Sequence, residues 1–190
     1  MGFAGLSTPR LWLRPFRGDD AAALAAYRSD PAVALYQGWT LPYTLADAEA
    51  LIESMQSGAP VQTGWYQIAL EERASGRLVG DVALCGVPPG QAELGFTLVA
   101  DTQGKGYATE ALTALLDHAF GALSLHRVFA GIDPRNGRAA ALLARLGFRH
   151  EGTALEAYWQ AGAWTDDAHY ALLAREWRAT VPSGSVHDHT

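Results

Sequence analysis

Two glycines flank the only lysine of the chain, at a junction whose chemistry suits a bound anion. A strand-like run, Leu94 to Val99, leads into a polar segment, and a long helix-like run begins directly after Gly104-Lys105-Gly106. The first turn of a helix has backbone N–H groups without partners and a partial positive charge. Glycine at 104 and 106 lets a phosphate approach the backbone, and Lys105 adds a full positive charge. The segment is therefore predicted to be an anion cradle.

A plain strand-to-helix turn with no ligand explains this composition equally well, because a lone Gly-x-Gly is a weak pattern. Two other phosphate motifs are excluded. A P-loop needs Ser or Thr after Gly-Lys, and Gly106 follows Lys105 here. A dinucleotide fingerprint needs a third Gly or Ala three residues after the second glycine, and Thr109 stands at that position.

Length, charge and cysteine content restrict the class of protein. The chain has 190 residues, enough for one well-buried core, so we predict a single domain over residues 1–178 and a disordered tail over 179–190. A net charge of −6 argues against nucleic-acid binding and is compatible with a cationic partner. The sequence has no long apolar run or signal-peptide pattern, and the lone Cys85 fits a reducing compartment. We expect a cytoplasmic protein with no membrane partner.

Hydrophobic periodicity predicts the elements that position the cradle. Strands are expected over residues 10–16, 65–71, 78–84, 92–99, 127–132 and 169–173. Helices are expected after Gly18-Asp19-Asp20 as far as Tyr27, and from a Thr44 cap to Met55. The helix after Gly106 is the strongest, with a buried stripe of Ala108, Ala111, Leu112, Leu115, Leu116 and Ala119. A further helix has Asn136 as its N-cap, Gly147 as its C-cap and one apolar face of Ala139, Leu142, Leu143 and Leu146. This order predicts a mixed α/β sheet in one domain.

Two separate motifs resemble one known family. Gln103-Gly104-Lys105-Gly106-Tyr107-Ala108 matches the Q/R-x-x-G-x-G/A signature of the GNAT superfamily of N-acetyltransferases. With Thr109-Glu110-Ala111 added, the segment is similar to the branch typified by ribosomal-protein-alanine acetyltransferases. Asn136, followed by Leu146-Gly147-Phe148 and Glu151-Gly152, resembles a second motif of that branch. The resemblance spans roughly residues 8 to 178.

The resemblance implies a fold and a cosubstrate site. The α/β fold would have a mixed, mostly antiparallel central sheet, flanked by helices and splayed between its fourth and fifth strands. The pantetheine arm of acetyl-CoA would lie in that gap, and the N–H groups of residues 104–109 would hold its pyrophosphate. The residues assigned to acetyl-CoA are Phe96, Leu98, Val99, Gln103, Gly104, Lys105, Gly106, Tyr107, Ala108, Thr109 and Asn136. For Asn136, a role as a plain helix cap is a comparable alternative.

Attack of an amine on a thioester needs a base, an oxyanion donor and a route for protonating the thiolate. Glu93 is the candidate base, on the same strand face as Gly95 and Thr97 by alternation. Its alternative role is a structural pair with an arginine. The backbone N–H of Leu98 or Val99 would be the oxyanion donor. The family's two usual acids are replaced here by Ala139 and Leu143, which leaves water or another residue such as Tyr158.

The acceptor side is less determined by the sequence. An aromatic group in loop-like segments either lines a substrate pocket or belongs to the core; it comprises Tyr36, Trp39, Tyr43, Tyr158, Trp159 and Trp164. The six histidines show no metal-ligand spacing, so no metal is expected. We expect acetyl transfer to a primary amine, in first place a protein or peptide N-terminal α-amine, by a monomer or homodimer. The alternatives are a small-molecule amine such as a polyamine or aminoglycoside, and a non-catalytic domain that senses coenzyme A.

Overall fold

The computed structural model describes residues 3–56, 58–62 and 64–180. Its strands are β1 (Leu6–Ser7), β2 (Leu11–Pro15), β3 (Trp65–Glu72), β4 (Leu78–Val87), β5 (Gln91–Leu98), β6 (Arg127–Ile132), β7 (Arg149–Gln160) and β8 (Ala163–Leu173). Its helices are α1 (Ala21–Arg28), α2 (Pro31–Ala34), α3 (Leu45–Met55), α4 (Tyr107–Phe120), α5 (Gly137–Arg145) and α6 (Ala174–Thr180). Within this part of the chain, no helix has the length and apolar character needed to span a membrane.

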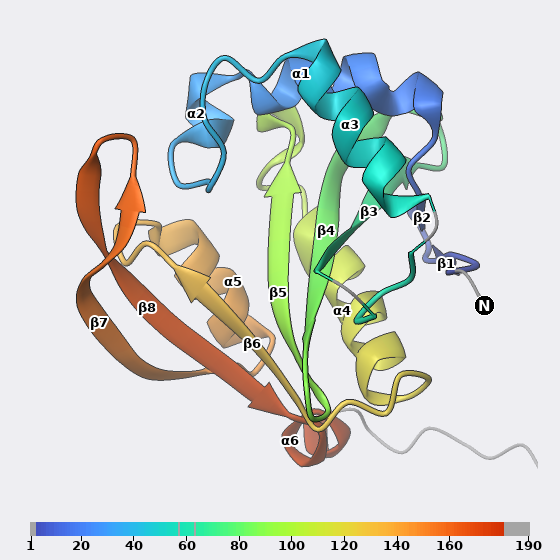
Figure 1. Ribbon diagram of the computed structural model, residues 1–190. Coiled ribbons are helices and arrows are strands. Elements are labelled where there is room, and N and C mark those ends of the chain that lie inside the picture. The colour runs from blue at the N-terminus through green and yellow to red at the C-terminus, as the bar shows by residue number, and fades with distance from the viewer. Residues whose placement is uncertain (1–2, 57, 63, 181–190) are drawn as a thin grey trace, which may run out of the picture.

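The strands form one mixed sheet that opens in its middle. In the described residues the order is β1-β2-β3-β4-β5-β6-β8-β7, and β5 with β6 is the parallel pair among otherwise antiparallel neighbours. The β5–β6 pairing covers Gln91–Glu93 and Arg127–Phe129 and then stops. Figure 1 shows the two strands together at one end and well apart at the other. They are the fourth and fifth strands of the prediction, so the predicted splayed sheet is confirmed.

The helices cover the two faces of the sheet. Leu112, Leu115 and Leu116 of α4 are fully buried, and so is Leu143 of α5. The helical stripes that periodicity predicts are thus the faces that pack against the core. Helices α1 and α3 contact each other, and in Figure 1 they lie in front of β3 and β4 while α4 lies behind them.

Local signals predicted the ends of several elements correctly. Thr44 caps α3 in a capping box with Asp47, and Asn136 caps α5 through the N–H of Ala139. Gly147, with φ +87°, follows the last residues of α5. The structure adds β1, α2, β7 and α6 to the predicted elements and makes β8 longer than predicted. Because α6 ends at Thr180, residues 179 and 180 of the predicted tail are helical, and residues 181–190 lie outside the described residues.

A buried ion cluster holds the start of α1 against the sheet. The Arg14 guanidinium donates to both carboxylate oxygens of Asp20, at 2.7 and 2.8 Å, and to Glu71 at 2.6 Å. Arg14 and Asp20 are both buried. Burial would raise the pKa of Asp20, but hydrogen bonds from Arg14 and the Arg17 backbone outweigh it and hold this pKa below its ordinary value.

We predict that Asp20→Asn lowers the free energy of unfolding by about 3 kcal/mol, because it leaves the buried Arg14 charge only partly compensated. Urea denaturation at pH 7 measures the loss, with exposed Asp19→Asn as the matched control, expected within about 0.5 kcal/mol of wild type. A carboxylate with a lowered folded-state pKa stabilises above its unfolded pKa of about 3.9. The difference in the free energy of unfolding between wild type and Asp20→Asn should therefore shrink as the pH falls below about 4. Equal stability of Asp20→Asn and Asp19→Asn at pH 7 would contradict the argument.

Candidate functional site

Two cavities meet at the opening between β5 and β6. The larger, about 1110 Å³, is bounded by the 103–109 segment and by α5, and is called here the α4–α5 cleft. The smaller, about 430 Å³, is bounded by residues 36–39, strands β3 to β5 and the β7–β8 hairpin, with Glu93 in its wall, and is called here the Glu93 cavity. The residues that line both are Tyr36, Gln37, Phe96 and Thr97. A molecule that occupies the cleft can therefore reach the Glu93 cavity through the gap in the sheet.

The turn before α4 has the backbone shape that the cradle requires. Gly104 and Gly106 both have left-handed φ angles, +74° and +82°, which residues with a Cβ rarely adopt. The first intrahelical bond of this turn runs from the Glu110 N–H to the Gly106 carbonyl, at 3.1 Å. The N–H groups of residues 107–109 precede that bond and are the orphan donors of the helix start. Together with Gly104, they can hold an anion in the cleft.

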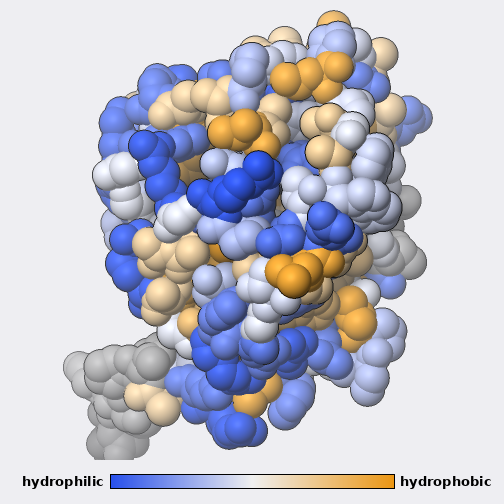
Figure 2. All heavy atoms as spheres, turned by 90° about the vertical axis from the view of Figure 1, so that its left-hand side faces the viewer, coloured by the Kyte–Doolittle hydropathy of each residue, from blue (hydrophilic) through white to orange (hydrophobic). Residues whose placement is uncertain are grey.

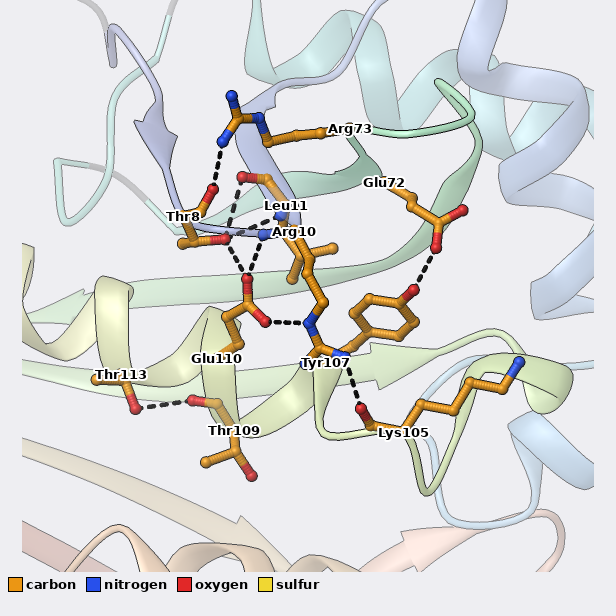
Figure 3. Close-up of polar contacts among 10 residues, drawn as sticks. All are labelled: Thr8, Arg10, Leu11, Glu72, Arg73, Lys105, Tyr107, Thr109, Glu110 and Thr113. Atoms are coloured by element: carbon orange, nitrogen blue, oxygen red, sulfur yellow. Dashed lines mark hydrogen bonds and ion pairs between the residues drawn. The ribbon is translucent and has the colours of Figure 1, made fainter.

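Arg10 fixes this turn from outside the cleft (Figure 3). Its guanidinium donates to the Lys105 carbonyl at 2.9 Å and to the Glu110 carboxylate at 2.6 Å. Glu110 also accepts hydrogen bonds from the Thr8 hydroxyl at 2.6 Å and the Arg10 backbone N–H at 2.7 Å. A Cβ on Gly106 would come within 3.3 Å of the Arg10 guanidinium. Gly106 thus leaves room for Arg10 as well as permitting the turn.

Three residues assigned to the cosubstrate do not direct their side chains into the cleft. Figure 3 shows the Tyr107 hydroxyl directed at Glu72 and the Lys105 side chain extended away from Arg10 and Glu110. Neither Lys105 nor Tyr107 lines the cleft, and Val99 does not line it either. The Val99 N–H donates to the Val79 carbonyl at 3.0 Å, so it is not free to serve as an oxyanion donor. Lys105 and Tyr107 remain candidates through their backbone N–H groups alone.

The other assigned residues lie on the wall of the cleft: Phe96, Leu98, Gln103, Gly104, Gly106, Ala108, Thr109 and Asn136. Because Val99 bonds to Val79 and antiparallel ladders alternate, the backbone groups of Leu98 and Phe96 point away from β4. They face the gap, where β5 has no pairing to β6. The Gln103 side-chain amide donates to the Leu98 carbonyl at 3.2 Å, and the Leu98 N–H is the oxyanion candidate that remains.

The sequence analysis missed three arginines, Arg135, Arg138 and Arg145, that line the α4–α5 cleft. Arg138 donates to the Gln103 side chain at 3.2 Å, whereas Arg135 pairs with Asp133. Their spacing was a usable signal, because residues 138 and 145 are two helical turns apart and share a face of α5. Asn136 caps α5 and lines the cleft at the same time, so the structure fits both of its suggested roles.

Glu93 is partly buried in the wall of the smaller cavity, with Gly95 and Thr97 beside it as alternation predicts. Burial raises the pKa of its carboxyl; the negative charge of Asp167 raises it further and His169 lowers it. The charged neighbours that shift this pKa are therefore Asp167 and His169 rather than an arginine. A carboxylate with a raised pKa in the wall of a cavity is suited to accept a proton.

The predicted aromatic group divides in three. Tyr43 lines neither cavity but packs against the core and contacts Trp39 edge to face. Tyr36, Trp39 and Tyr158 line the Glu93 cavity, together with Trp65 of β3. Trp159 and Trp164 are exposed and contact each other edge to face at the end of the β7–β8 hairpin. On the face that includes this hairpin, Figure 2 shows hydrophobic side chains in separate patches between hydrophilic ones. Within the described residues, no group of three His, Cys, Asp or Glu side chains is placed to hold a metal ion.

Comparison with known proteins agrees with this geometry. The model of a family described as an acetyltransferase (GNAT) domain matches residues 10–149. An uncharacterized N-acetyltransferase p20 of Bacillus licheniformis is 32% identical over 176 residues, which are 90% of this chain and 97% of the relative. An Escherichia coli [ribosomal protein uS5]-alanine N-acetyltransferase is 39% identical over 84 residues, 44% of this chain and 43% of the relative. The structure of Mycobacterium smegmatis RimJ in complex with CoA-disulfide superimposes with a TM-score of 0.77 at 30% identity, covering 87% of this chain and 83% of that one.

We predict that Arg10→Ala weakens coenzyme A binding about tenfold, because the Lys105–Gly106 turn loses the hydrogen bond that holds its carbonyl. Lys105→Ala should lower the affinity for coenzyme A less than tenfold, and less still in high salt, because an exposed ammonium near a phosphate contributes little to binding. Calorimetric titration with coenzyme A measures both, beside circular dichroism to verify folding.

Arg77→Ala is the matched control, because it removes an exposed ion pair with Asp101 outside the turn. Its affinity should equal that of wild type. A hundredfold loss in Lys105→Ala, or an unchanged affinity in Arg10→Ala, would show that the lysine rather than the fixed turn holds the anion.

Proposed function

Since the chain belongs to the GNAT family of N-acetyltransferases, we propose that it transfers the acetyl group of acetyl-CoA to the N-terminal α-amine of a peptide or protein. The observation that carries the proposal is the pair of cavities that meet at Phe96 and Thr97, with Glu93 in the smaller one. One cavity suits a long anionic donor and the other a small cationic acceptor. The gap in the sheet lets the two react.

The residues of the α4–α5 cleft fit acetyl-CoA. Orphan N–H groups at the start of α4 and the nearby arginines suit its phosphates. The unpaired edge of β5 at Phe96 and Leu98 suits the amides of its pantetheine arm. When bound, acetyl-CoA supplies the activated acetyl thioester, and the protein holds it so that the thioester lies at the gap.

Glu93 is proposed to accept the proton that the acceptor ammonium must lose, directly or through water. The neutral nitrogen then forms its bond to the acetyl carbon, and the carbon–sulfur bond breaks. The Leu98 N–H donates to the acetyl oxygen, where negative charge develops. The departing thiolate takes a proton from water or from Tyr158, whose side chain lines the Glu93 cavity. The nitrogen loses a second proton as it becomes the amide nitrogen, and this proton replaces, through water, the one given to the thiolate. The products are an acetamide, a thiol and the proton held by Glu93, which returns to solvent.

The side chains at the family's usual acid positions cannot protonate the thiolate. Ala139 lines the cleft but has no ionisable group, and Leu143 is fully buried in the core. An acceptor that is already partly neutral suits such a site. At pH 7 an α-amine is roughly 10% neutral and a lysine ε-amine roughly 0.04%. This difference favours an α-amine, and the similarity to an alanine N-acetyltransferase of a ribosomal protein supports the same acceptor.

A polyamine is the second candidate acceptor, because carboxylates dominate the wall of the Glu93 cavity. They are Asp81, Glu93, Asp133, Asp166 and Asp167, with Arg28 as the cation among the lining residues. Spaced negative charges attract a molecule with several ammonium groups. A direct competition between the two acceptors therefore belongs in the test.

We predict that Glu93→Gln lowers kcat by about 10² to 10⁴ and leaves the affinity for coenzyme A unchanged, since the amide cannot accept the proton. Because the pKa of Glu93 is raised, the acid limb of the wild-type kcat/KM profile should lie above the ordinary glutamate value of about 4.3. Thiol release measures the rates, and Glu53→Gln on the exposed side of α3 is the control. A wild-type rate in Glu93→Gln would show that Glu93 has a structural role and does not act as the base.

The acceptor prediction uses one peptide with a free N-terminal alanine and one internal lysine. The α-amine should be acetylated faster at pH 7, and the gap should narrow as the pH rises to 9, because the lysine becomes more neutral. Tandem mass spectrometry maps the products, and equimolar spermidine is added in a parallel reaction. Preferential lysine modification at pH 7, or acetylation of spermidine alone, would refute the α-amine acceptor and leave the acetyltransferase activity standing.

A further inference from the structure

Strand register brings a residue of β8 to the same face of the sheet as Glu93. Glu93 pairs with Phe129, and two residues further along β6 Gly131 pairs with His169 of β8. Paired residues direct their side chains to the same face, and so do residues two apart on one strand. Asp167, two residues before His169, therefore shares the face of Glu93, and both line the Glu93 cavity.

Gly131 of β6 leaves the space that the Asp167 carboxylate occupies. A Cβ at position 131 would lie 2.7 Å from one Asp167 oxygen and 3.1 Å from the other. Gly131 does not have a left-handed φ angle, so its backbone would accept other residues. Because Gly131 has no side chain, the Asp167 carboxylate can lie over β6, on the same face of the sheet as Glu93.

Other carboxylates in the wall of the cavity are already engaged. Asp81 is fully enclosed and accepts from Tyr27 and Arg28, and Asp166 accepts from the Glu156 backbone N–H at 2.8 Å. Asp133 is held by Arg135. Asp167 instead has the half-exposed His169 at 3.5 Å, a contact that is ionic only when the histidine is protonated. Asp167 thus keeps its charge available for a cation in the cavity.

We propose that Asp167 is the second carboxylate of the acceptor site and binds the acceptor amine as its ammonium ion beside Glu93. The inference rests on the proposed function and adds a residue that recognises the charge of the acceptor. Asp167 holds the cation, and Glu93 takes one proton from it. The remaining N–H bonds of the neutral amine can still donate to Asp167, which keeps the nitrogen in place as it forms its bond to the acetyl carbon.

A second consequence concerns the basicity of Glu93. Burial raises the pKa of Glu93 first, then the charge of Asp167 raises it, and His169 opposes both. Cys85, opposite Glu93 on β4, has a pKa raised by burial and by Glu93 itself. The other charged groups of the cavity wall are Arg28, Asp81, Asp133 and Asp166. Removing the charge of Asp167 should therefore make Glu93 a weaker base, with an acid limb at lower pH.

The test is Asp167→Asn, assayed with acetyl-CoA and a peptide carrying an N-terminal alanine. We expect the KM of the peptide to rise about tenfold, the KM of acetyl-CoA to stay unchanged, and the acid limb of the kcat/KM profile to move to lower pH. A purely structural role would not shift that limb. Asp101→Asn removes one exposed negative charge outside the cavity and should match wild type in all three measurements.

Gly131→Ala tests whether the position of the Asp167 carboxylate over β6 matters, while the charge of Asp167 is kept. The added Cβ should displace the carboxylate and raise the KM of the peptide in the wild-type background. In an Asp167→Ala background the same substitution should have no further effect, because no carboxylate remains to be displaced. An equal effect of Gly131→Ala in both backgrounds would show that Gly131 acts independently of Asp167.

Failure of the inference and failure of the proposed function give different results. If wild type releases no thiol with the peptide or with spermidine, the proposed function is wrong. If wild type is active but Asp167→Asn keeps the wild-type peptide KM and the wild-type acid limb, only the role of Asp167 is overturned. Circular dichroism of each variant separates both results from misfolding.

Discussion

The early end of pairing between β5 and β6 is the constraint on which the site depends. Backbone N–H and C=O groups inside a protein must find partners, and a strand that leaves its neighbour gives up a row of them. Here the ladder stops at Glu93 and Phe129, and the edge of β5 beyond it faces a cavity instead of a strand. Helix α4 contacts β2 in one half of the sheet and α6, which follows β8, at the other, and so helps to hold the open sheet together. In the proposed function, the pantetheine amides of acetyl-CoA would complete the hydrogen bonding that the fold leaves open.

The position of Glu93 follows from the same constraint. It is the last residue of β5 that is paired on both sides, with Cys85 of β4 and Phe129 of β6. Its backbone is therefore rigid, while its side chain faces the cavity that the divergence creates. A general base needs a fixed position and partial desolvation together, and the apex of two diverging strands provides both. If the sheet were closed, the cavity would be lost; if it opened one residue earlier, Glu93, the proposed base, would no longer be paired with β6.

Sequence patterns predicted the elements whose burial is regular and failed where it is not. The α4 and α5 stripes recur at helical spacing because one face of each helix is buried. Nearly every residue of β7 is exposed, so it shows no alternation, and only the end of β8 is buried. The short helix α2 was not predicted, although Pro31 stands at its first position, where proline favours a helix start. The cradle and Asn136 were predictable because their geometry is local. Arg10 and Asp167 are brought to the site by segments that are adjacent in space but far apart in the sequence. No local sequence pattern shows which segments will be adjacent.

The two cavities carry opposite charge, although the net charge of the chain is −6. Three arginines and the start of α4 border the α4–α5 cleft, and carboxylates border the Glu93 cavity. The Asp133–Arg135 pair joins the two, because its aspartate faces one cavity and its arginine the other. In the proposed reaction, the anionic donor would be attracted to the cleft and the cationic acceptor to the Glu93 cavity, which would sort the substrates before they meet. The distribution of charge between the two cavities would therefore orient the proposed reaction more than the net charge of the whole sequence does.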